Sequence, residues 1–244
     1  MKFTEGYWLL SERTNGQFAS QAYHIEAMEN GLRVVAPTSP VLSRGDTLNR
    51  PTITIEFLAV SPEVISVRAW HYEGYRTGEA RFEKKETTCD AVVTITENEA
   101  VLDAGRVSVH VDRKNWGYSF WADGKLLTSS GFHNLGYVRW DRSVSSMLPQ
   151  DNYMKEHEYT PYMTQDLLLA PGENVYGFGE RFTAFVKNGQ VVETWNEDGG
   201  TASQVAYKNI PFYMTNRGYG VFVDHTGNVS FEVASEKVEY VGFS

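Results

Sequence analysis

Cysteine is almost absent from this sequence. Cys89 is the only one among 244 residues, so the chain has no internal disulfide and no thiolate cage for zinc. The first eight residues carry one positive charge, then an acid, and no continuous apolar stretch of the kind found in a signal sequence. Together these features predict a protein of a reducing compartment, by default the cytoplasm.

Long apolar runs and surplus positive charge are also missing. The longest apolar runs, such as 167–170, are far shorter than the roughly 20 residues that a membrane-spanning helix needs. The 31 Asp and Glu residues outnumber the 22 Lys and Arg residues, which gives a net charge of -9. Nucleic-acid binding requires a basic surface, which this balance disfavours. We therefore expect neither a membrane nor nucleic acid as a partner.

Several catalytic signatures are missing as well. The sequence contains no Gly-x-Ser-x-Gly elbow, no phosphate-binding loop ending in Gly-Lys-Ser or Gly-Lys-Thr, and no His-Glu-x-x-His motif. Cys89 has no histidine beside it in the sequence, and the six histidines are dispersed singly. From these residues we predict no metal site, no cofactor and an idle or buried Cys89.

The dominant pattern that is present is alternation of apolar and polar residues, which is typical of strands that bury one face. It is clearest at 53–57 and 107–111. Further strands are predicted at 64–70, 91–96, 117–121, 165–169, 219–224, 229–233 and 237–243. Tight turns between antiparallel strands are predicted at Asn30-Gly31, Asp123-Gly124 and Asn188-Gly189. The pattern favours one all-β domain of stacked antiparallel sheets over residues 1–244.

Two polar segments, 78–90 and 141–160, interrupt the alternation and are predicted to be surface connections. The alternation then continues to Ser244 without a polar tail. Natural domain ends are usually frayed and polar, so this ending predicts a chain that is truncated or is a piece of a longer protein.

The densest cluster of unusual residues begins at 174–182. Gly177 and Gly179 flank Phe178, which indicates close packing of the backbone. Gly-x-Gly is a weak signal for a dinucleotide site, and no helix pattern follows it. Glu180 and Arg181 come next, and we interpret them as a buried ion pair or a hydrogen-bond network that organises loops.

A second cluster, at 192–200, combines residue types that suit a sugar. Trp195 offers an apolar ring for the C–H face of a pyranose, and the carboxylate of Asp198 suits its hydroxyl groups. Asn196 and Glu197 lie between them, and Gly199-Gly200 follows. The alternative interpretation of Asp198-Gly199 is a plain turn.

These motifs, taken in order, resemble the amino-terminal domain of glycoside hydrolase family 31, and most of all its bacterial α-xylosidase branch. The segments that carry the resemblance are VYGFGERF at 175–182, NGQ at 188–190, ETWNEDGG at 193–200, AYKNIPFYM at 206–214, TNRGYGV at 215–221 and FEVASEKV at 231–238. The resemblance is dense from about residue 175 onward and diffuse before it.

The resemblance implies a large antiparallel β-sandwich of the galactose mutarotase-like type, followed in the family by a (β/α)8 barrel. Two aspartates on that barrel perform retaining hydrolysis through a covalent glycosyl-enzyme intermediate. A barrel needs about 250 residues of alternating strand and helix, whereas β pattern already fills this chain. We therefore expect the catalytic barrel to be absent, this chain to carry no catalytic residue, and the chain alone to be inactive.

The resemblance also implies that one loop of the sandwich reaches the mouth of the active site. Asp198 matches that loop and is expected to accept hydrogen bonds from a sugar hydroxyl, while Trp195 contacts the sugar or braces the loop. The residues expected to support the loop or the interface with the barrel are Glu180, Arg181, Phe182 and Tyr207.

The implied reaction is removal of α-linked xylose from the non-reducing end of oligosaccharides. An α-glucoside substrate remains an alternative, and so does a stand-alone carbohydrate-binding module with no reaction. Aldose mutarotase activity, by analogy of fold alone, would need a convergent His and Glu that no spacing here identifies. The expected partners are an oligosaccharide and the barrel of the same polypeptide, and a homo-oligomer of the full-length protein stays open.

Overall fold

The computed structural model describes residues 2–6, 9–48, 50–72, 82–83, 87, 89–141, 159–198 and 203–244. In these segments the chain forms strands arranged in four sheets, together with one short 3-10 helix, η1 (Arg44–Thr47). The paired strands run antiparallel, so the predicted all-β, antiparallel fold class is confirmed. None of the described segments contains a helix with the length and apolar character of a membrane span.

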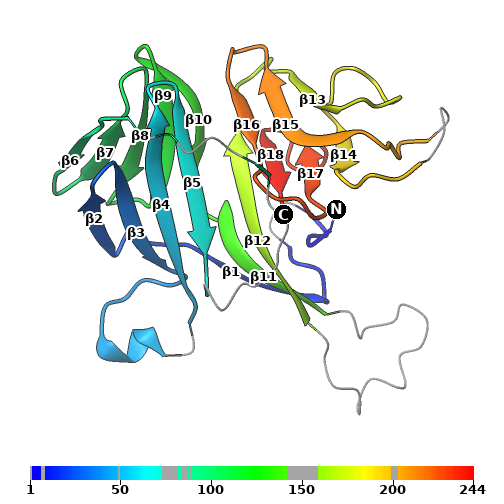
Figure 1. Cartoon of the computed structure of the whole chain (residues 1–244). Coiled ribbons are helices and arrows are strands. Elements are labelled where there is room, and N and C mark those ends of the chain that lie inside the picture. Colours follow the sequence, from blue (N-terminus) through cyan, green and yellow to red (C-terminus); the bar gives the residue numbers. More distant parts are fainter. Residues whose placement is uncertain are drawn as a thin grey trace, which may run out of the picture.

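The first half of the chain forms two facing sheets (Figure 1). The four-stranded sheet has the order β2-β3-β4-β5, and the five-stranded sheet has the order β10-β9-β8-β7-β6. Their strands are β2 (His24–Met28), β3 (Gly31–Pro37), β4 (Thr52–Ser61), β5 (Val64–Trp70), β6 (Val92–Ile95), β7 (Glu99–Asp103), β8 (Val107–Asp112), β9 (Gly117–Ala122) and β10 (Lys125–Ser130). Ile55 and Phe57 pack against Leu102 and Val109 in a first core, core 1, where all four side chains are fully buried.

The second half forms another pair of sheets. A six-stranded sheet has the order β1-β11-β12-β18-β17-β14, and a three-stranded sheet has the order β13-β15-β16. Their strands are β1 (Thr14–Phe18), β11 (Leu135–Asp141), β12 (Tyr159–Leu168), β13 (Val175–Gly179), β14 (Gln190–Glu193), β15 (Asn209–Thr215), β16 (Gly220–Phe222), β17 (Ser230–Val233) and β18 (Tyr240–Phe243). Phe178 and Tyr213 from one sheet pack with Phe231 and Val241 from the other in a second core, core 2.

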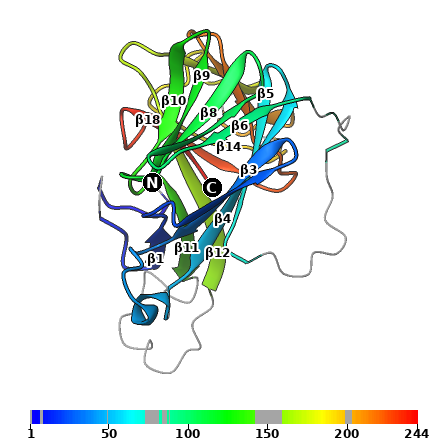
Figure 2. The ribbon, with the colours of Figure 1, turned by 90° about the vertical axis from the view of Figure 1, so that its left-hand side faces the viewer.

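Strand β12 connects the two pairs of sheets because it runs beside β10. The Thr128 hydroxyl donates to the carbonyl oxygen of Leu168 at 2.8 Å, and the Gln165 amide donates to the Ser130 hydroxyl at 2.7 Å. The two ends of the described chain also lie close together (Figures 1 and 2). The organisation of residues 1–244 as one domain stays a prediction. The structure shows two buried clusters, core 1 and core 2, and the contacts between β10 and β12 join them.

The predicted strands and turns agree with the structure where the alternation is strongest. The range 64–70 coincides with β5, and Asp123-Gly124 forms the tip of the β9–β10 hairpin with φ angles of 50° and 73°. The predicted connection at 141–160 is wrong at its ends, because Asp141 and Tyr159 pair in the ladder of β11 with β12. Residues 142–158 and most of 78–90 lie outside the described residues.

Candidate functional site

Strand β13 ends in a bulge at Gly177-Phe178-Gly179, and this bulge positions the residues after it. The three residues have φ angles of 121°, 66° and 86°. The register with β15 shifts between the two glycines. A Cβ atom on Gly179 would lie 2.1 Å from the carbonyl oxygen of Lys208, so only glycine fits this approach. The close backbone packing predicted from the two glycines is therefore confirmed.

Arg181 follows the bulge and ties three backbone segments together. Its Nε donates to the carbonyl oxygen of Phe178 (3.2 Å), and its Nη atoms donate to those of Gln204 (3.1 Å) and Glu193 (2.5 Å). Nη2 also donates to the side-chain oxygen of Asn209. Burial lowers the pKa of Arg181, while the Glu193 carboxylate acts in the opposite direction. Charged donors make strong, directional hydrogen bonds, so Arg181 positions the loop between β14 and β15.

Asn209, the first residue of β15, fastens that loop from the other side. Its Nδ2 donates to the carbonyl oxygens of Trp195 (2.8 Å) and Ala206 (2.6 Å), and its backbone N–H donates to Oδ1 of Asn196 (3.0 Å). The Glu197 N–H donates to the Ala206 carbonyl oxygen at 2.9 Å, next to an isolated parallel bridge between Asn196 and Ala206. The loop is thus closed across its base by hydrogen bonds.

The start of the same loop is anchored to core 2. Thr194 is buried, and both its backbone N–H (2.9 Å) and its hydroxyl (3.0 Å) donate to the carbonyl oxygen of Val229. The Ser230 hydroxyl donates to the Glu193 carboxylate at 2.5 Å. These contacts fix the point from which Trp195 leaves the sheet.

The two residues predicted to contact sugar lie on the outer part of this loop. The Trp195 side chain is 54 % exposed, and Asp198 is exposed. Gly199-Gly200 lies outside the described residues. An exposed ring and an exposed carboxylate three residues apart, on a loop whose base is fastened, can meet a ligand from solvent without refolding of the base.

The residues predicted to support the loop lie in different surroundings. Phe182 and Tyr207 are exposed, at 57 % and 66 %. Glu180 is also exposed, and its carboxylate pairs with Lys208 (2.7 Å), a contact that raises the pKa of Lys208. Of the two alternatives predicted for Glu180 and Arg181, the buried ion pair does not form, because the bulge directs Arg181 inward and leaves Glu180 at the surface. The hydrogen-bond network is present at Arg181.

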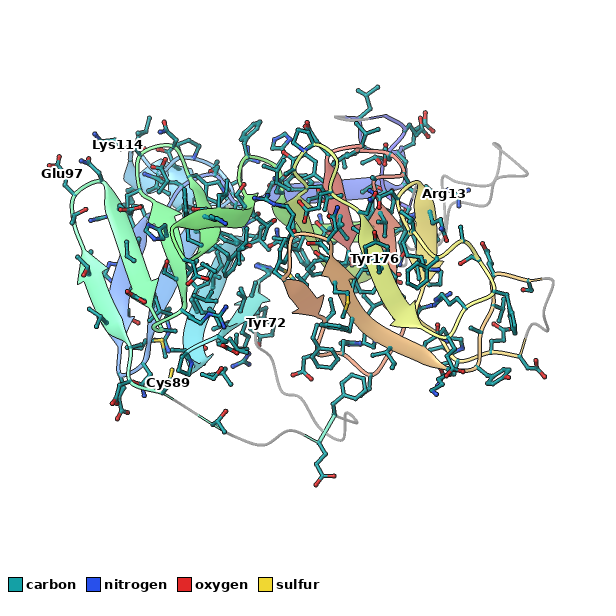
Figure 3. The ribbon with its side chains drawn as sticks, turned by 90° about the horizontal axis from the view of Figure 1, so that it is seen from above. Arg13, Tyr72, Cys89, Glu97, Lys114 and Tyr176 are labelled. Carbon is teal, nitrogen blue, oxygen red and sulfur yellow. The ribbon has the colours of Figure 1, made fainter. Side chains whose placement is uncertain are left out.

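Next to the loop, the outward side of the three-stranded sheet is apolar. We call it the apolar face, and it consists of Tyr176, Phe185, Ile210, Phe212, Met214 and Phe222. The rings of Tyr176 and Phe185 are 5.2 Å apart, and Tyr176 pairs with Met214 across the sheet. Figure 3 shows Tyr176 on the side of the molecule opposite the five-stranded sheet. Of these side chains, Phe185, Ile210, Met214 and Phe222 are exposed, while Tyr176 and Phe212 are half-buried.

The chemistry that the loop offers is recognition of hydroxyl groups and of an apolar ring face. Within the described part of the chain, no three His, Cys, Asp or Glu side chains converge on a point where a metal ion would bind. Sequence reasoning missed Asn209, because its hydrogen bonds join residues that are distant along the chain. Its place in the AYKNIPFYM segment was the only signal.

The arrangement of the sheets is shared with a domain of a known enzyme. The structure is similar to that of the cycloalternan-forming enzyme from Listeria monocytogenes in complex with a pentasaccharide substrate, with a TM-score of 0.70 and 14 % identity. The match covers 94 % of this chain and 20 % of that one, so this fold is a domain of a larger enzyme there. Residues 53–232 match the model of the glycosyl hydrolase 31 N-terminal galactose mutarotase-like domain, and the chain belongs to this family.

Two curated relatives match along the whole chain. The α-xylosidase XylQ of Lactiplantibacillus pentosus is 41 % identical over 100 % of this chain and 30 % of its own length. The α-xylosidase of Emericella nidulans is 35 % identical over 100 % of this chain and 32 % of its own length. The chain therefore spans about a third of these relatives. The predicted resemblance to family 31 is confirmed.

Proposed function

We propose that this chain is the amino-terminal β-sandwich region of a retaining α-xylosidase that removes α-linked xylose from the non-reducing ends of oligosaccharides. The observation that carries this proposal is the 41 % identity with α-xylosidase XylQ over the entire chain. Because the chain corresponds to 30 % of that enzyme, the two carboxylates of the retaining mechanism belong to the remainder of the full-length protein. An α-glucoside substrate has less support, because both whole-chain relatives named above are α-xylosidases.

The loop between β14 and β15 supplies a part of the substrate site in this proposal. Asp198 accepts hydrogen bonds from sugar hydroxyls, and the Trp195 ring stacks on a pyranose face. Arg181 and Asn209 hold the backbone that carries both side chains. These residues orient the glycan, and they leave bond cleavage to the full-length protein's carboxylates.

The apolar face is the proposed contact with the catalytic barrel of the same polypeptide. Ile210, Met214 and Phe222 are 45 %, 51 % and 44 % exposed, and removing such side chains from water stabilises an interdomain contact. Phe182 and Tyr207, which are also exposed and follow β13 and precede β15, are proposed to support the same contact. The barrel would cover the apolar face, and the loop between β14 and β15 would then lie at the active site of the barrel.

We further propose a cytoplasmic location. Support comes from the single cysteine, Cys89, which has no partner cysteine in this chain and is partly buried. Fractionation of cells that express the full-length protein tests this, and recovery in the extracellular or membrane fraction would contradict it.

The decisive experiment measures hydrolysis of 4-nitrophenyl α-xyloside and α-glucoside by the full-length protein and by the 244-residue chain. We expect the full-length protein to prefer the xyloside and the chain alone to release no 4-nitrophenol.

Asp198→Asn in the full-length protein is expected to raise KM about tenfold, because a hydrogen bond to a charged group is worth about 1.5–3 kcal/mol. Preference for the glucoside would assign an α-glucoside, instead of an α-xyloside, as the substrate. Saturable glycan binding at Trp195 without any hydrolysis by the full-length protein would favour a binding module.

A further inference from the structure

The outer surface of the five-stranded sheet carries a depression far from the Trp195 loop. It has a volume of about 460 Å³ and lies where β8 and β9 meet the turns at Gly105 and Gly124. Figure 1 shows β6 to β10 on the side of the molecule opposite β13 and β14. A volume in this range is typical of small-molecule sites, which span about 300–1,000 Å³.

The floor of the depression is an aromatic platform. Alternation along β9 directs Tyr118 into core 1 and leaves Trp121 on the outer surface, half-buried. The Trp121 Nε1 donates to the Ser119 hydroxyl at 2.8 Å, and the ring lies 5.8 Å from that of His110. His110 itself bonds to Glu99 through Nδ1 at 2.8 Å. The platform is therefore held in one orientation before any ligand arrives, which lowers the entropic cost of binding.

The rim of the depression is polar and equally well fastened. Arg106 pairs with Glu63 (2.5 Å) and lies 3.7 Å from the Asp123 carboxylate. The backbone N–H of Arg106 donates to the carbonyl oxygen of Pro62 at 2.9 Å, and Asp103 caps the N–H of Gly105 at 2.8 Å. A guanidinium group has five N–H donors and each carboxylate accepts several hydrogen bonds, so the rim offers both donors and acceptors beside the ring.

The charges around the ring decide the class of ligand. The single guanidinium of Arg106 faces the carboxylates of Glu63 and Asp123, and Asp103 adds a further negative charge. An anionic ligand such as a phosphate would meet no surplus of positive charge here. An uncharged ligand with many hydroxyl groups and an apolar ring face matches both the rim and the platform.

We infer that this depression is a saccharide-binding site centred on Trp121, with Arg106 and Asp123 as its hydroxyl partners and a neutral pyranose oligomer as its ligand. The inference does not rest on the Trp195 loop or on the proposed hydrolase activity. It gives the chain a second surface that holds a glycan, at the end of the molecule opposite the first.

The test follows the indole N–H signals of the 244-residue chain in ¹H–¹⁵N spectra during titration with maltoheptaose and with a xyloglucan heptasaccharide. The Trp121 signal is assigned by its loss in Trp121→Phe. We expect a saturable shift of this signal with at least one of the two glycans, and none with inorganic phosphate. Trp121→Ala lacks the indole signal, so its binding is followed through the backbone amide signals of Gly105 and Gly124, which line the same depression. The substitution should weaken binding about tenfold or more, because one central aromatic side chain carries most of such a contact.

The control is Trp195→Ala, which should leave the Trp121 shift and its midpoint unchanged. A second variant, Asp123→Asn, keeps the ring and should weaken binding severalfold through the loss of a charged acceptor. The inference is overturned if neither glycan shifts the Trp121 signal at roughly 20 mM, well above a millimolar dissociation constant. It is also overturned if the backbone amide signals of Gly105 and Gly124 in a well-folded Trp121→Ala variant shift with an unchanged midpoint. Either result leaves the proposal for the Trp195 loop untouched, since that loop has its own indole signal.

Discussion

Arg181 and Asn209 meet through a hydrogen bond from the guanidinium Nη2 to the side-chain oxygen of the amide. Arg181 thereby holds the oxygen of the amide and leaves its nitrogen to donate to the carbonyl oxygens of Trp195 and Ala206. One amide thus links the bulge after β13 to the loop that carries Trp195. The orientation of the amide follows from these partners, because only Nδ2 can donate.

Asn209→Asp tests this link while it preserves the shape of the side chain. The carboxylate still accepts from Arg181 but donates nothing, so the Trp195 carbonyl oxygen loses its donor, the Ala206 carbonyl oxygen keeps only the Glu197 N–H, and both oxygens face a negative charge. We expect the free energy of unfolding, measured with urea, to fall by about 1–3 kcal/mol. The exposed Asn228, replaced by Ala, is the control and should change it by less than about 0.5 kcal/mol. Equal effects of the two substitutions would contradict the link.

Gly179 and Gly189 have nearly equal φ angles, 86° and 84°, but very different surroundings. A Cβ atom at Gly179 meets the Lys208 carbonyl oxygen at 2.1 Å, whereas at Gly189 it meets nothing within 4 Å. Gly189→Ala should cost only the left-handed backbone penalty of about 1–2 kcal/mol. Gly179→Ala should cost at least about 2 kcal/mol more, because the ladder of β13 with β15 has to shift. Urea unfolding curves of both variants measure the difference, and similar midpoints would argue against a required close approach.

His133 is predicted to make stability depend on pH. Burial lowers the pKa of His133 from its ordinary value of 6.5, and the positive charge of Lys237 lowers it further. Below about pH 6.5 the unfolded state therefore binds more protons than the folded state, so the free energy of unfolding falls as the pH drops through this range and on through the lowered pKa. His133→Asn, which tolerates the φ of 61° at this position, should remove that part of the slope. Identical pH profiles of the two proteins between about pH 5 and 8 would refute the assignment.

Asp166 and Lys237 form an ion pair between β12 and the turn before β18, with side chains only 16 % and 20 % exposed. Burial raises the pKa of Asp166, and Lys237 opposes this rise. Lys237→Met should therefore raise the pKa further and lower the free energy of unfolding at pH 7 by about 3 kcal/mol. Part of the loss should return on acidification, because the folded state then takes up a proton on Asp166 more readily than the unfolded state.

The control for the ion pair is the double variant Asp166→Asn with Lys237→Met. It removes the buried negative charge together with its partner, so its stability at pH 7 should exceed that of Lys237→Met alone. Chemical denaturation of the wild type, the single variant and the double variant measures the coupling. A double variant that is less stable than Lys237→Met would show that the charge of Asp166 has another essential partner.

Alternation predicted the fold class because it marks which side of a strand is buried. Ile53, Ile55 and Phe57 are predicted to share one face, and all three are fully buried in core 1. The same signal fails at 237–243, where β18 begins only at Tyr240. There the Tyr240 N–H closes a turn onto the Lys237 carbonyl oxygen at 3.0 Å, and the side chains of this turn happen to alternate in polarity.

Other parts of the structure depend on contacts that no local pattern carries. Strand β1, with the sequence TNGQF, has only one large apolar residue, and its extended form comes from pairing with β11. At the candidate site, the polar sequence around Trp195 and Asp198 predicts an exposed loop. The anchoring of that loop depends on Asn209 and Arg181, whose hydrogen bonds are set by the bulge and the fold rather than by spacing.

The division of the buried side chains into two cores has a consequence for synthesis on the ribosome. Core 1 is built from Ala19 to Leu135, whereas core 2 needs residues as late as Val241. A nascent chain can thus fold its first pair of sheets during translation, while β1, which is made earliest, waits unpaired until β11 emerges. Pulse proteolysis of stalled nascent chains of increasing length should show protection of the first pair before the second, and simultaneous protection of both would contradict this order.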